Sequence, residues 1–222
     1  MKKTILAFLL IFAALGVFAQ NGVLREISGT VELKGSGASS FVPAAVGDQV
    51  GQDTIISTGF KSTALVEIGS TLIAVRPLTR LTLTEIRAST GAETLNVNLS
   101  AGRVVVDVNP PAGTRASMSV SSPSATASVR GTKFKFDLMN LEVYEGNVLF
   151  GSSKGGYSYM VGTRTFGRMG PDGNPIDPVF GYLTGLKPKS PVGSGKATGN
   201  DEGEPTSNSS GPEGSINVGL LY

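Results

Sequence analysis

The chain has 222 residues, with 19 Lys and Arg against 17 Asp and Glu, and it contains no histidine, cysteine or tryptophan. Zinc, copper and haem sites rely on His or Cys ligands, and Ser-His and Cys-His nucleophiles need one or both of these residues. We therefore expect no metal, no cofactor, no catalytic residues and no enzymatic activity. The nearly balanced charge argues against nucleic acid as a partner.

The N-terminus has the pattern of a secretory signal peptide. Lys2 and Lys3 precede an apolar run from Ile5 to Ala19, and small residues end that run. A membrane span needs about 20 apolar residues, so cleavage is favoured over an uncleaved anchor. We expect residues 1–19 to be removed before Gln20, leaving no membrane span. The mature protein would then be periplasmic, or otherwise extracytoplasmic or secreted.

Residues 20–185 show the alternation of an all-β domain. Examples are the runs 81–83 and 95–99, where apolar and polar residues alternate, and the run 104–108, where Val104, Val106 and Val108 alternate with Val105 and Asp107. Gly69, Gly102 and Gly146 lie between such runs, where glycine supplies the positive φ of a tight turn. This pattern predicts many short strands in an antiparallel-rich sandwich or roll, or in a short β-solenoid.

The stretch from Ser128 to Asp137 contains two extended segments interrupted by a glycine. Phe134 and Phe136 alternate with Lys133 and Lys135, which predicts one buried and one exposed face. Gly131 comes just before this strand. We interpret it as a structural corner, and we expect it to adopt a positive φ.

The segment from Tyr157 to Tyr182 is the best candidate for an interaction surface, because it is rich in aromatic residues, Met and Arg. Its candidate contact residues are Tyr157, Tyr159, Arg164, Phe166, Arg168, Phe180 and Tyr182. The alternative is that these aromatic rings close one end of the β core, with Asp172-Gly173 as a hairpin turn.

The C-terminal part has a different composition. Residues 186–214 are rich in Gly, Ser and Pro, which predicts a disordered linker. Residues 215–222 are apolar again. They could add a strand to a sheet edge of this chain or of a partner, or they could fray.

Several short patterns along the chain resemble those of the FecR domain family. From Val46 to Leu83 they include Gly47-Asp48, Thr58-Gly59, Gly69-Ser70 and Pro77, placed between alternating strands. Further on, the run from Leu99 to Val106 is similar to a family strand, and Ser122-Pro123, Gly131-Thr132, Phe134 and Phe136 follow in the family's order. Val143, Gly146 and Val148 match its closing pattern, so the resemblance covers about residues 46–150.

The resemblance implies a non-catalytic β-module that contacts other proteins. The best-known relatives are inner-membrane regulators with a cytoplasmic segment that controls a sigma factor. This chain departs from them, because a signal peptide stands where that segment and the membrane helix belong. We therefore expect an exported module that binds a protein of the periplasm or cell envelope. The alternative is a carbohydrate- or peptidoglycan-binding module in which Tyr157, Tyr159 and Tyr182 stack on the sugar rings of a cell-wall glycan.

Overall fold

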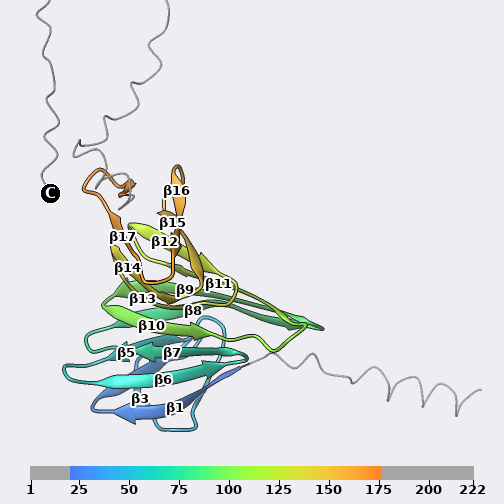
Figure 1. Ribbon diagram of the computed structural model, residues 1–222. Coiled ribbons are helices and arrows are strands. Elements are labelled where there is room, and N and C mark those ends of the chain that lie inside the picture. Colours follow the sequence, from blue (N-terminus) through green and yellow to red (C-terminus); the bar gives the residue numbers. More distant parts are fainter. Residues whose placement is uncertain (1–20, 177–222) are drawn as a thin grey trace, which may run out of the picture. The chain divides into compact units, whose positions relative to one another are not determined.

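The computed structural model describes residues 21–176, and all regular structure in this range is β-strand. Eighteen strands form two nine-stranded sheets, A and B (Figure 1). The expectation of an all-β protein is thus confirmed. The signal peptide at 1–19, the linker at 186–214 and the apolar segment at 215–222 lie outside the described residues. Within the described range, no helix is long and apolar enough to cross a membrane.

The strands of each sheet are given in their spatial order. Sheet A contains β18 (Pro175–Ile176), β17 (Phe166–Met169), β14 (Asn140–Glu145), β13 (Lys133–Asp137), β10 (Arg103–Val108), β7 (Thr71–Val75), β6 (Thr63–Ile68), β1 (Gly22–Ser28) and β4 (Gln49–Val50). Sheet B contains β16 (Ser158–Gly162), β15 (Asn147–Ser152), β12 (Ala125–Val129), β11 (Arg115–Ser121), β9 (Ala92–Ala101), β8 (Arg80–Ser89), β5 (Ile55–Thr58), β2 (Val31–Lys34) and β3 (Val42–Pro43).

The chain moves back and forth between the sheets after every one or two strands, and both sheets grow in the same direction. Figure 1 shows this progression from β1 to β16 and β17 along the colour gradient. All strand pairs are antiparallel except β9 with β11, which are joined through β10 in the opposite sheet. Of the architectures expected from the sequence, the structure is therefore an antiparallel-rich two-sheet sandwich.

The core lies between the two sheets because nearly every strand is apolar on one side only. One continuous cluster of buried side chains draws on both sheets. Phe136 of sheet A and Phe150 of sheet B are both fully buried, and their rings meet edge to face with centroids 6.4 Å apart. Phe134 is also fully buried, while Lys133 and Lys135 point outward, as the alternation predicts.

The outer faces of the two sheets have different chemistry. The outer face of sheet A carries cross-strand ion pairs, which join Arg25 to Glu67, Lys133 to Asp107 and Lys135 to Glu142. A hydrogen bond from Arg25 lowers the pKa of the Glu67 carboxyl. On sheet B, the outward positions in the middle of β9, β11 and β12 hold only Ser, Thr and Asn. They are Thr94, Asn96, Asn98, Ser117, Ser119, Ser121, Thr126 and Ser128.

The glycine turns follow the sequence prediction at three positions and differ at the fourth. Gly69, Gly102 and Gly146 have φ values of 54°, 85° and 84°. Gly131 lies at the bend between β12 and β13, but it is not among the residues with positive φ, so the expectation for its backbone was wrong. The left-handed residue of this corner is instead Gly146. A Cβ there would lie 2.8 Å from the carbonyl oxygen of Gly131 and from Thr132 Oγ1.

The core assignment predicts a large asymmetry between the two faces of β13. Phe136→Ala should lower the free energy of unfolding by about 3–5 kcal/mol, because it empties a fully buried site. Lys135→Ala should change it by less than about 0.5 kcal/mol, since a partly exposed ion pair contributes little. Urea unfolding measures both, and equal losses would contradict the described register.

The geometry of the corner predicts that substitutions at its two glycines differ in their cost to stability. Gly146→Ala should cost about 1–3 kcal/mol, because alanine is strained at positive φ and the added carbon meets backbone atoms. Gly131→Ala should cost less than about 0.5 kcal/mol, since its nearest contact would be Pro110 Cδ at 3.7 Å. Thermal unfolding of the two variants compares them directly, and a larger loss at Gly131 would be inconsistent with this geometry.

Candidate interaction surfaces

The aromatic segment forms one end of the sandwich, where its rings continue outward from the core. The Phe150 ring meets Tyr159 edge to face at 6.0 Å, and Tyr159 stacks on Tyr157 at 6.3 Å. Tyr159 is half-buried, and its hydroxyl donates a hydrogen bond to the carbonyl of Ile176. Tyr157 is 57% exposed. The series of rings therefore runs from the core to the surface.

Gly167 makes this packing possible. A Cβ at this position would lie 2.9 Å from Phe150 Cδ1 and 3.2 Å from the Tyr159 hydroxyl. The backbone of β17 thus packs directly against the two rings, which leaves no room for a side chain. The expectation that aromatic residues close one end of the core holds for Tyr159, but it does not hold for the exposed Tyr157 and Phe166.

The remaining candidates among residues 21–176 do not form one patch. Phe166 is 61% exposed and lies beside Glu142 on the outer face of sheet A, two positions before the exposed Arg168. Arg164, with φ of 61°, is in the turn between β16 and β17. Phe180 and Tyr182 lie outside the described residues. The described part of the segment, residues 157–176, therefore contributes to both sheets at this end of the sandwich.

The turn between β17 and β18 contains Asp172 and Gly173, where a hairpin turn was considered. Gly173 has φ of 77°, and Asp172 accepts hydrogen bonds from the backbone amide and side-chain amide of Asn174. These bonds lower the pKa of the Asp172 carboxyl. The carboxyl thus closes a local turn.

Sequence reasoning missed an apolar pair on the outer face of sheet B. Leu149 of β15 and Met160 of β16 are cross-strand neighbours, and they are 44% and 59% exposed. The signal was present in the sequence. Val148, Leu149 and Phe150 are three consecutive apolar residues in a strand where alternation would place a polar residue at the middle position.

This apolar pair forms one wall of an open groove of about 570 Å³. The opposite side is lined by Ser117 and Ser128, and the exposed Arg130 lies at its end, next to Gly131. Thr132 is buried in the groove wall, and its hydroxyl donates to the carbonyl of Asn147 at 3.1 Å. Gly131-Thr132 thus shapes a surface and joins two strands.

Strand β16 differs from the other strands at the sheet ends. Strands β3, β4 and β18, which end the sheets elsewhere in the described range, have two residues each. β16 has five, Ser158 to Gly162, with no charge and no proline. Natural proteins usually protect edge strands with short length, charge or proline. Because β16 has none of these devices, it has the composition of a strand that pairs with another chain.

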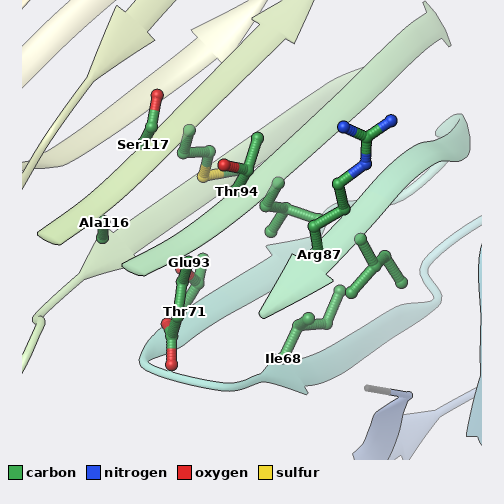
Figure 2. A pocket seen from close by; sticks show the side chains of 10 residues that line it. Ile68, Thr71, Arg87, Glu93, Thr94, Ala116 and Ser117 are labelled. Carbon is green, nitrogen blue, oxygen red and sulfur yellow. The ribbon is translucent and has the colours of Figure 1, made fainter. Parts of the chain in front are cut away.

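A second hollow, between the β6–β7 turn and strands β8, β9 and β11, has a volume of only about 10 Å³, the space of a single water. Figure 2 shows Arg87 extending away from Glu93 at this site. The Glu93 carboxylate accepts hydrogen bonds from the Ser70 amide at 3.0 Å and from its hydroxyl at 2.6 Å. This carboxylate therefore anchors a turn. Over residues 21–176, no cluster of three or more Asp, Glu, His or Cys side chains could hold a metal ion.

A known protein family matches the sequence of the central part of this sandwich. Residues 54–149 match the family model described as FecR protein. The FecR resemblance seen in the sequence is thus confirmed over this range. The match starts just before β5 and ends within β15. Strands β1 to β4 and β16 to β18, which complete both ends of the two sheets, lie outside the matched FecR range.

Two solved structures from Parabacteroides distasonis ATCC 8503, both provisionally described as anti-sigma factors, are similar to this chain. The first is 14% identical, with a TM-score of 0.45, and the similarity covers 59% of this chain and 65% of that one. The second is 15% identical, with a TM-score of 0.44, over 55% and 57% of the two chains. This chain thus spans less than two thirds of either structure. No curated protein matches it.

Proposed function

We propose that this chain is an exported, non-catalytic FecR-like module that binds a protein of the periplasm or cell envelope through β16 and the adjoining Leu149–Met160 pair. The observation that carries the proposal is an uncharged five-residue edge strand beside an exposed apolar pair. An extended segment can pair with such an edge through its main chain, while flanking side chains give specificity. The FecR match supports a role in protein contacts.

The groove adds specificity to this contact. A strand laid along β16 would place side chains beside Met160, and the groove continues from there to Ser128 and Arg130. Because β16 lies outside the FecR match, this contact would distinguish the chain from others that share only the matched domain.

Glycan binding is the second candidate, and the neutral face of sheet B favours it. The hydroxyl and amide side chains of β9, β11 and β12 form a surface that could hydrogen-bond to sugars. The aromatic contribution is smaller than expected from the sequence. Tyr159 is half-buried beneath Tyr157, which leaves one of these two rings well exposed. We therefore rank this function below protein binding.

Location is tested by the N-terminus of the accumulated protein. Since the apolar run from Ile5 to Ala19 is too short for a typical span, the released chain should start at Gln20 and appear in the osmotic-shock fraction. N-terminal sequencing of that fraction checks the cleavage site. Protein that keeps Met1 and stays with the membrane would overturn the export part of the proposal.

Binding is tested by placing a photo-cross-linking residue at Met160 and, as a matched control, at Leu72. Leu72 is 39% exposed on the outer face of sheet A. We expect a protease-sensitive adduct from Met160 in cells and none from Leu72. Adding Tyr157→Lys should abolish it, because a charge beside an edge strand opposes pairing. Absence of an adduct, combined with co-sedimentation on purified cell wall, would favour the glycan function instead.

A further inference from the structure

A second exposed apolar feature lies away from β16, at the end of the sandwich where β5 turns into β6 and β7 into β8. Phe60, in the first of these loops, is 74% exposed, and Leu78, in the second, is 61% exposed. The Leu78 amide donates to the carbonyl of Gly59 at 3.2 Å, so the two loops lie side by side. We call Phe60, Lys61, Arg76, Leu78 and Arg103 the loop rim.

Buried hydroxyl groups hold the base of the loop rim. Ser62 and Thr79 are each 1% exposed. Ser62 Oγ donates to the carbonyl of Phe60 at 3.1 Å and accepts from the Thr30 amide at 2.8 Å. Thr79 Oγ1 bridges the amide and carbonyl of Arg103, and Thr58 Oγ1 donates to the carbonyl of Arg76 at 2.6 Å. The loops are therefore fixed, and their apolar side chains are held outward.

The backbone at both tips is strained. Lys61 and Leu78 have φ values of 54° and 56°, a region that non-glycine residues seldom occupy. Glycine or asparagine would fit more easily, so these residues keep a large side chain at an energetic cost. Strain of this kind concentrates at functional sites.

Cations surround the two apolar tips. Lys61, Arg76 and Arg103 are exposed, and Arg80 flanks them with its guanidinium over the Phe41 ring. None of these four belongs to an ion pair in the described part of the chain. The acidic neighbour of Arg103 in the strand register is Asp137, whose Oδ1 accepts hydrogen bonds from the amides of Met139 and Asn140. The rim is thus a positive surface with two apolar projections.

We propose that the loop rim docks on an anionic lipid surface. Phe60 and Leu78 project from neighbouring turns, and neither side chain lines the groove or the small hollow described above. Such projecting side chains fit insertion between lipid headgroups better than capture of a strand or helix. The cations would lie at the level of the lipid phosphates, where each Lys or Arg adds affinity. In sheet B, β8 and β5 are separated from β16 by four or more strands, so lipid contact at the rim leaves the edge strand available for pairing.

The test uses the chain from Gln20 onward, the form that export would release, and vesicles of phosphatidylcholine with or without phosphatidylglycerol. We expect co-sedimentation only with the anionic vesicles, and weaker binding as salt screens the charges. Phe60→Ser combined with Leu78→Asn should reduce affinity at least about tenfold. Asn tolerates the left-handed backbone, so this variant should fold. Arg76→Gln with Arg103→Gln should reduce affinity about fivefold per charge and flatten the salt dependence.

Leu72→Ser is the matched control, since it removes an exposed apolar side chain from a strand face outside the rim. It should bind as the parent does. Thermal unfolding should show that all variants remain folded. Failure of the parent chain to bind anionic vesicles, or equal binding by the Phe60 and Leu78 variant, would overturn the proposal. If that variant instead loses binding to an acidic protein while vesicle binding is absent, the rim is a protein site and the lipid assignment is wrong.

Discussion

The structure depends on one constraint, which is that nearly every strand carries apolar side chains on one face alone. A single sheet with solvent on both sides would leave these apolar side chains in water, so two sheets must pack with their apolar faces together. The edge-to-face contact of Phe136 with Phe150 is a local expression of this requirement, because it joins strands of opposite sheets. A chain that alternates between the sheets satisfies the constraint strand by strand, and every crossing creates a loop at one end of the sandwich.

The positions of the candidate surfaces follow from that arrangement. Inner side chains are committed to packing and outer side chains to solvent, which leaves the loops and the sheet ends as places with more freedom. The loop rim uses buried hydroxyl groups of Thr58, Ser62 and Thr79 in place of apolar packing, so that Phe60 and Leu78 remain outside the core. Near β16 and β17, by contrast, the absence of a side chain at Gly167 lets the rings of Phe150 and Tyr159 pack against the backbone of β17.

Sequence reasoning succeeded where one physical rule decided the outcome. Alternation identified the inward Phe134 and Phe136, and turn chemistry identified the positive φ of Gly69, Gly102 and Gly146. It failed at Gly131, because the crowded position at that corner is Gly146, which lies between β14 and β15 and comes next to Gly131 only after folding. The sequence identified the aromatic segment as a candidate interaction surface, but it did not indicate that its hairpins carry Phe166 and Met160 to opposite sheets. The parallel pairing of β9 with β11 likewise depends on long-range topology, which has no local signature.

The back-and-forth path between the sheets also determines the order in which partners become available. From β3 onward, every strand pairs with at least one strand that precedes it in the chain, as β6 does with β1, β10 with β7 and β15 with β12. A chain that emerges N-terminus first, whether from a ribosome or through a membrane pore, therefore never has to wait for a distant later segment before its newest strand can pair. From β5 onward, each new strand adds at the same end of its sheet, so the growing edge there is always the most recent strand. This limits the time during which any one strand waits unpaired at that edge and could aggregate.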